Sequence, residues 1–297
     1  MELDNHCVIE RHGGLYIYKM RFRSLSEVER YLRTNPSVNA EIFYTQKSIT
    51  ASPRFAGEPL EKAIRYCLGG YDNNFARFMQ IKKEIDRVNL KKNHNRKTVA
   101  AVVGSRPNVP AFIAGAPKTM YRMERAQEKK FIEIYMDLTY DHTTDEEQIV
   151  NRGILTLNLI SLLEEQGIYV NFKVFQCCYV NDEVFYVEID LKKPEERINV
   201  QKCYYPMCGK EFLRRVLVRI MESMPFKRNW FMSYGTVMNE KQIRSVLEIP
   251  EDKIMILAPR AMGILGKNIY EDADAFLSRI KLNEEIYFPS YRKQDEE

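Results

Sequence analysis

Strand patterns alternate with helix patterns through the C-terminal half of the chain, and this alternation constrains the fold more than any other feature. A compact apolar strand pattern over 130–138 includes Asp137 at its end, and an amphipathic helix pattern follows over 145–166. The segments that continue the alternation are strands at 169–175, 184–191, 230–233 and 253–258 and helices at 209–224, 241–247 and 272–280. Such an order builds a mostly parallel sheet covered by helices, with one antiparallel hairpin strand. We therefore expect a three-layer α/β domain over 126–297.

The first 125 residues have a less regular order of elements, which predicts a smaller α+β region. A strand pattern covers 15–22, and Ser24-Leu-Ser-Glu27 is a capping-box sequence that opens a helix through Leu32. A second helix pattern begins after Pro59 and ends at the Gly69-Gly70 pair. The remaining segments are strands at 41–45 and 98–103, a loop at 48–57 and a helix at 74–90.

The formal net charge of +4 conceals an asymmetry between the two halves of this 297-residue chain. Residues 1–125 contain 22 Lys and Arg against 12 Asp and Glu, whereas residues 126–297 contain 23 against 29. The basic half either binds an anionic partner or is attracted to the acidic half. Both interpretations stay open at this point.

A run of cations at the end of the third helix pattern is the best candidate for nucleic-acid binding. Clustered cations can neutralise phosphates and release counterions. The alternative is a solvated helix end, where positive charge is favourable. The cations of this basic segment, residues 82–97, are Lys82, Lys83, Arg87, Lys91, Lys92, Arg96 and Lys97.

The segment 104–120 is rich in Gly and Pro and also apolar, which predicts a long ordered connection whose apolar residues are buried. Gly104, Ser105 and Arg106 can place backbone amides and a guanidinium near an anion. The segment lacks the Gly-Lys-Ser/Thr ending of a phosphate-binding loop, so structural packing is the alternative.

Acidic and hydroxyl side chains follow the first strand of the C-terminal half. Asp137, Thr139 and Asp141 offer oxygen ligands that suit Mg²⁺, at the strand end where ligand sites of α/β proteins collect. Because carboxyl ends of parallel strands meet at one edge of a sheet, we expect Tyr234 to lie close to them. The alternative is that Asp137 caps the following helix or pairs with a cation. With His142, the two aspartates also raise the hypothesis of a metal-dependent hydrolase.

Two motifs resemble a family of phage and prophage proteins without an assigned function. They are Phe22-x-Ser24-Leu25-x-Glu27 and Gly104-Ser-Arg-Pro-Asn-Val-Pro-x-Phe-x-Ala-Gly-x-Pro-x-x-Met120. The resemblance covers most of the chain and implies a phage context rather than a mechanism.

The order of elements over 128–282 also resembles the von Willebrand factor A domain, which is Rossmann-like. That family places a metal site at the end of its first strand, formed by Asp-x-Ser-x-Ser with a distant Thr and Asp. The matching residues here are Asp137, Thr139 and Asp141, with Asp141 in place of the last Ser. Ser233-Tyr234-Gly235 stands where the family has Thr-Asp-Gly. The resemblance therefore implies a degenerate metal site.

The sequence contains no G-x-S-x-G, H-E-x-x-H or G-x-G-x-x-G pattern. No apolar run approaches the roughly 20 residues of a membrane helix, and the first residues lack a signal peptide's apolar region. We therefore expect a cytoplasmic, phage-type, non-enzymatic interaction protein that binds a protein partner through its C-terminal domain and has no membrane partner. It would act in the host cytoplasm if phage-encoded. No cofactor is expected other than the Mg²⁺ considered above, the oligomeric state stays open, and nucleic-acid binding is the alternative function.

Overall fold

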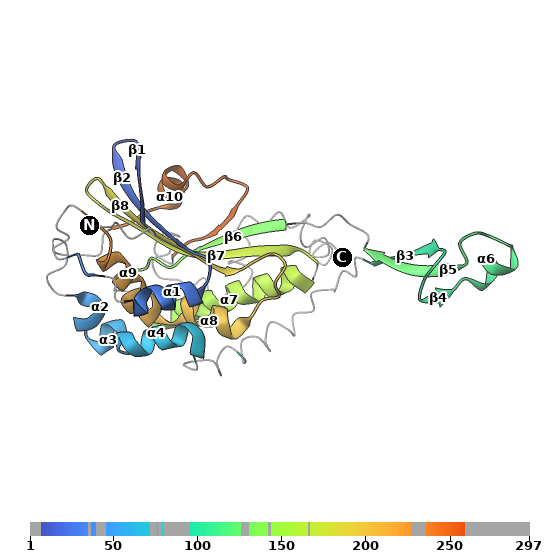
Figure 1. Cartoon of the computed structure of the whole chain (residues 1–297), viewed down its shortest axis with the longest axis horizontal. Coiled ribbons are helices and arrows are strands. Elements are labelled where there is room, and N and C mark those ends of the chain that lie inside the picture. Colours follow the sequence, from blue (N-terminus) through green and yellow to red (C-terminus); the bar gives the residue numbers. More distant parts are fainter. Residues whose placement is uncertain are drawn as a thin grey trace, which may run out of the picture.

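The computed structural model describes residues 7–34, 37–39, 46–71, 76, 79, 96–125, 131–141, 144–165, 167–226 and 236–258. These residues form a body built on one large sheet and a projecting arm, defined here as residues 96–125 (Figure 1). No described helix is both long and apolar enough to cross a membrane.

The large sheet has the order β1-β2-β8-β7-β6-β10, and β9 pairs with β7 outside this path. Its strands are β1 Cys7–His12, β2 Leu15–Phe22, β6 Phe131–Asp137, β7 Tyr169–Val180, β8 Glu183–Lys192, β9 Thr236–Val237 and β10 Ile254–Ile256. From β2 to β10 the pairings are parallel except for the β7–β8 hairpin, whose turn contains Asn181 with φ of 57°. The predicted mixed α/β architecture with a mostly parallel central sheet is confirmed. The predicted antiparallel hairpin is β7–β8, but the β1–β2 hairpin and the β7–β9 pairing are antiparallel as well.

Helices cover both faces of this sheet, most of them on one face (Figure 1). That face carries α1 Leu25–Arg33, α2 Lys47–Thr50, α3 Pro53–Ala56, α4 Leu60–Gly69, α7 Glu146–Glu165, α8 Val200–Cys208, the π-helix η1 Phe212–Leu217 and α9 Val218–Glu222. On the other face, α10 Glu240–Leu247 packs Ile243 and Val246 against Ile17 and Phe175 of the strands.

The two predicted regions share one sheet and one core. Tyr16–Phe22 of β2 run parallel to Glu183–Ile189 of β8, and the Tyr18 hydroxyl donates to Glu183 at 2.8 Å. Apolar residues of α1 and α4 join the core formed by α7 and α8. The division predicted at residue 125 therefore does not coincide with a break in the sheet.

Several local predictions were accurate and others were wrong. The strand 15–22 is β2, and Ser24 accepts a hydrogen bond from the Glu27 amide at 3.2 Å to cap α1. The segment 48–57, predicted as a loop, instead contains most of the short helices α2 and α3. The helix predicted over 209–224 is observed as η1 and α9. The helix α8, which precedes them, was not predicted. Predictions for 41–45, 230–233 and 272–280, and most of 74–90, lie outside the described residues.

The arm is a small sheet of order β3-β5-β4 with a short helix at its tip (Figure 1). Its elements are β3 Arg96–Ala101, β4 Arg106–Pro107, α6 Val109–Ile113 and β5 Met120–Arg125. The chain passes over β5 at Gly104, where an added Cβ would lie 2.1 Å from the Tyr121 carbonyl oxygen. Asn108 caps α6 by accepting from the Ala111 amide at 3.2 Å. The close packing of the backbone at Gly104 and the Asn108 cap thus stabilise the arm.

Candidate functional site

The end of β6 was the predicted metal site, and the structure describes Asp137, Thr139 and Asp141 of it. Asp137 is fully buried, and its Oδ1 accepts a hydrogen bond from the Thr139 amide at 2.8 Å. Burial raises the pKa of Asp137 to about 7, against the opposing effects of Thr139 and of the Arg152 charge. The Thr139 hydroxyl accepts from the Cys177 amide at 3.0 Å, so it binds β7 rather than facing a ligand.

Two arginines hold the backbone around this strand end. Arg152, fully buried on α7, donates from Nη1 to the carbonyl oxygens of Asp137 at 2.8 Å and Leu257 at 3.2 Å, so it joins the ends of β6 and β10. Arg214 of η1 donates from Nη2 to the carbonyl oxygens of Tyr140 at 3.2 Å and Asp141 at 2.9 Å. The strand end is therefore secured by guanidinium–carbonyl contacts.

Two of the predicted Mg²⁺ ligands, Asp137 and Thr139, are buried, and Mg²⁺ binding stays a prediction. An ion needs several oxygen ligands at one position; Thr139 is engaged with β7, whereas the buried Asp137 Oδ2 has no hydrogen-bond partner among the described residues. Among the described residues, no group of three or more His, Cys, Asp or Glu side chains is placed to hold a metal. His142, Ser233 and Tyr234 lie outside the described residues, so their predicted proximity to Asp137 stays a prediction.

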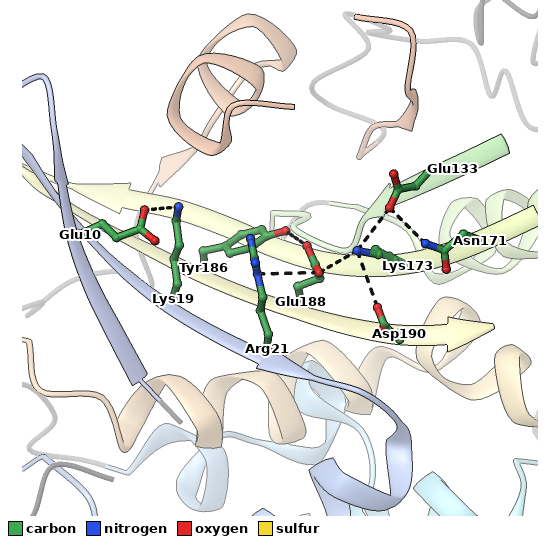
Figure 2. Close-up of polar contacts among 9 residues, drawn as sticks. All are labelled: Glu10, Lys19, Arg21, Glu133, Asn171, Lys173, Tyr186, Glu188 and Asp190. Atoms are coloured by element: carbon green, nitrogen blue, oxygen red, sulfur yellow. Dashed lines mark hydrogen bonds and ion pairs between the residues drawn. The ribbon is translucent and has the colours of Figure 1, made fainter. Parts of the chain in front are cut away.

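A polar network lies on the face of the sheet opposite the main helix layer (Figure 2). Lys173 of β7 is at its centre, with Nζ 3.1 Å from Glu188, 3.3 Å from Glu133 and 3.9 Å from Asp190. The alternate residues of the same strands, such as Phe172 and Ile189, enter the apolar core. The network therefore extends across β6, β7 and β8 on the side where the strands lack a full apolar cover.

Further hydrogen bonds and ion pairs extend this network toward the N-terminal strands (Figure 2). The Tyr186 hydroxyl donates to Glu188 at 2.5 Å, and the Arg21 Nε lies 3.9 Å from the same carboxylate. Asn171 donates to Glu133 at 3.1 Å. The four carboxylates of Figure 2 thus have cationic neighbours, including the Lys19–Glu10 pair at the β1 end.

The electrostatics of the network favour a structural role over catalysis. Burial by itself lowers the pKa of Lys173, but the Glu188 carboxylate and other neighbours raise it above the usual value. Lys173 therefore stays charged at neutral pH and is a poor base or nucleophile. Burial also raises the pKa of Asp190, with Glu188 adding to the effect. The network binds neighbouring strands to one another on the same sheet face as the apolar residues packed against α10.

The arm presents the largest group of exposed apolar side chains in the described part of the chain. Phe112 and Ile113 of α6 are 72% and 78% exposed, and Val103 near the crossing over β5 is 75% exposed. The other large apolar residues exposed on the arm are Val102, Val109, Tyr121 and Met123. The expectation that apolar residues of 104–120 are buried was wrong for Val109, Phe112 and Ile113, because α6 lies at the tip of the arm, away from any core (Figure 1).

The arm also carries part of the predicted basic segment. Arg96 and Lys97 are the first two residues of β3, and Arg106 is an exposed residue of β4. Lys118 and Arg122 add two exposed cations, so the arm combines apolar and positively charged surface. The remaining predicted nucleic-acid contacts, Lys82, Lys83, Arg87, Lys91 and Lys92, lie outside the described residues.

Sequence reasoning missed Arg152, Lys173 and the exposure of the arm. Single charged residues interrupt apolar runs at both Arg152 and Lys173, and such a pattern is typical of a buried charge with specific partners. No comparable signal distinguishes the exposed apolar residues of the arm from core residues.

The comparisons with known proteins give one match. No curated protein and no solved structure matches the chain. Residues 6–284 match a family described as a domain of unknown function (DUF7192), and this match includes the sheet, the helix layers and the arm. The chain therefore belongs to the DUF7192 family.

Proposed function

We propose that this chain is a non-enzymatic interaction protein that binds a protein partner through the arm. The observation that carries the proposal is the group of exposed apolar side chains on the arm, with Phe112 and Ile113 at its tip. Contiguous exposed apolar surface is costly in water and marks interaction sites. Aromatic residues and Met, present here as Phe112, Tyr121 and Met123, are enriched at protein interfaces.

The body serves as a rigid platform for this arm. The sheet order β8-β7-β6-β10 with antiparallel β8 supports a von Willebrand factor A-like C-terminal domain. In this proposal the domain works without metal, because Asp137 and Thr139 are engaged within the protein. The same engagement weighs against a metal-dependent hydrolase. The phage or prophage context is a further part of the proposal and rests on the two motifs alone.

Site-specific photo-crosslinking tests the proposal. A photoreactive residue at position 112 of the full chain, expressed in its native host, should form a covalent adduct with one protein in stoichiometric yield. The variant Phe112→Ser/Ile113→Ser should lose that protein in affinity capture. Leu68→Ser is the matched control, since Leu68 is 56% exposed but lies on α4 of the body. Equal capture by both variants would contradict a role for the arm.

Nucleic-acid binding is the second candidate and is favoured by the charge of the arm. Residues 96–125 contain 6 Lys and Arg against 1 Asp or Glu. Binding of this kind weakens steeply with salt, by about one unit of the log–log slope per phosphate contact. Filter binding of single- and double-stranded probes at low salt should detect it, and Arg106→Ala/Lys118→Ala should then reduce the slope by about two. Absence of retention of either probe would eliminate this candidate.

A further inference from the structure

We infer that the partner of the arm is a second copy of this chain, and that the arm of one copy docks on the C-terminal half of the next. The inference rests on the proposed function, in which the arm binds a protein. It adds the identity of that protein and the region that accepts the arm.

No described part of the chain covers the apolar surface of the arm. Figure 1 shows the arm pointing away from the body, with α6 at the far end. Phe112 and Ile113 on α6 are 72% and 78% exposed. A short three-stranded sheet with most of its large apolar side chains in water has little core of its own. A second molecule at the tip would take its apolar residues out of water.

The arm and residues 126–297 of the same chain have opposite net charge. The arm has 6 Lys and Arg against 1 Asp or Glu, and residues 1–95 have 16 against 11. Residues 126–297 have 23 against 29, so they form the one acidic region of the sequence. Two arms placed against each other repel, whereas an arm placed against the acidic region of another copy is attracted.

Exposed acids lie at the start of α7, within the acidic region. Asp145, Glu146 and Glu147 are consecutive exposed acids at the start of α7. Arg106 and Lys118 are exposed cations on the two sides of α6 in the sequence. Lys210 of the same chain lies 3.0 Å from Glu146, so the arm cations would share or replace that exposed pair at the rim of a contact whose centre is Phe112 and Ile113. Interfaces commonly have this arrangement of an apolar centre and a polar rim.

A contact between an arm and a different region is not self-complementary. Each copy then has one arm to donate and one acidic region to receive an arm. Such head-to-tail contacts generate closed rings or open chains rather than two-fold dimers. We therefore expect assemblies that grow with protein concentration.

Sedimentation equilibrium on the full chain tests the inference. At about 100 µM and low salt, the average mass should exceed the 35.1 kDa of one chain and should rise with concentration. Phe112→Ser/Ile113→Ser should weaken association about 100-fold, because two apolar side chains lose their cover. Leu68→Ser should leave the mass unchanged. Arg106→Glu/Lys118→Glu should weaken association about tenfold, and mixing it with Glu146→Lys/Glu147→Lys should restore association.

Cross-links from a photoreactive residue at position 112 locate the acceptor in the assembled protein. Cross-links to residues within 126–297 of another copy support the inference, and cross-links between two arms overturn it. A chain that stays monomeric at about 100 µM also overturns it. If that monomer still cross-links through position 112 to a different protein in its host, the proposed function stands and the inference fails. If the monomer instead floats with vesicles of phosphatidylcholine and phosphatidylglycerol, and the Phe112→Ser/Ile113→Ser variant does not float, both the inference and the proposed function fail.

Discussion

The body and the arm contain similar apolar residues but place them in opposite environments. In the body, Ile134 of β6 and Phe172 of β7 are fully buried beneath the helix layer. In the arm, Phe112 and Ile113 are mostly exposed, and Gly104 together with the Asn108 cap maintains the local fold. Similar apolar residues are therefore buried in the body and exposed in the arm. The two regions should respond differently to substitution.

Arg215→Ala should produce the largest loss of stability. Arg215 is buried on η1 and donates to the carbonyl oxygens of Ser48, Ile49, Ala51, Gly57 and Glu58 at 2.9 to 3.3 Å. Its removal leaves those carbonyls without their donor, and we expect the free energy of unfolding to fall by about 3 to 5 kcal/mol in urea titrations. Arg106→Ala in the arm should change it by less than about 0.5 kcal/mol. Equal losses of unfolding free energy for Arg215→Ala and Arg106→Ala would contradict the difference between the body and the arm.

The buried carboxyl of Asp137 should make the body sensitive to pH. Its pKa is raised by burial from 3.8 to about 7, so the folded protein binds a proton that the unfolded chain releases between these values. This contribution to stability is fully present below pH 4, is lost as the pH rises and is gone above about pH 7. Asp137→Asn should therefore stabilise the protein at pH 8 relative to the parent, by about 2 to 4 kcal/mol, and not at pH 4.

Urea unfolding of both proteins from pH 4 to pH 8 provides the measurement. Asp145→Asn is the matched control, since Asp145 is an exposed aspartate just before α7. Parallel stability curves for the parent and Asp137→Asn would show that Asp137 does not titrate in this range.

Removing one methylene from each region should change the free energy of unfolding by less, and it compares a buried with an exposed isoleucine directly. Ile134 is fully buried, and Ile134→Val should reduce the free energy of unfolding by about 0.5 to 1.5 kcal/mol. Ile113 is 78% exposed, and Ile113→Val should leave the stability of the unassembled protein within about 0.3 kcal/mol of the parent. A loss at position 113 equal to that at position 134 would indicate that the arm tip is packed in the monomer.

Gly104→Ala should have the smallest effect on the body and a local effect on the arm. An added Cβ would lie 2.1 Å from the Tyr121 carbonyl oxygen, so the chain cannot keep its path over β5. Amide hydrogen exchange should accelerate in β4 and β5, while the thermal midpoint of the body stays within about 1 °C. Gly69→Ala on α4 is the control, because no atom lies within 4 Å of its added Cβ. Unchanged exchange in the arm would contradict the role of Gly104.

The sequence predicted the elements that combine strong periodicity with clear end signals. The strand 15–22, the Ser24 cap and the helix ending at Gly69-Gly70 are all present as β2, α1 and α4. The strand β1 was missed although Gly13 and Gly14, both with positive φ, form a two-residue hairpin turn that could have indicated it. The parallel alignment of β6, β7 and β10 was also predictable, because alternating strands and helices favour it.

The environment of the candidate site was not predictable in the same way. The position of Asp137 at a strand end predicts an exposed ligand, but its side chain is buried, and Arg152, 15 residues later in the sequence, donates to its carbonyl oxygen. The exposure of Phe112 depends on the arm standing apart from the body (Figure 1). Both properties arise from tertiary placement, which periodicity does not encode.

The contacts of the N-terminal elements with β8 and η1 cannot form until β8 and η1 have been synthesised on the ribosome. Arg215 and Ser48 are 167 residues apart, and Tyr18 and Glu183 are 165 residues apart. At roughly 5 to 20 residues per second, the partners of β2 and α2 emerge on the order of 10 to 30 s after them. During that interval apolar residues of α1 and α4, such as Val28 and Ile64, are without their core. The nascent chain therefore exposes these apolar residues to chaperones until η1 has left the exit tunnel.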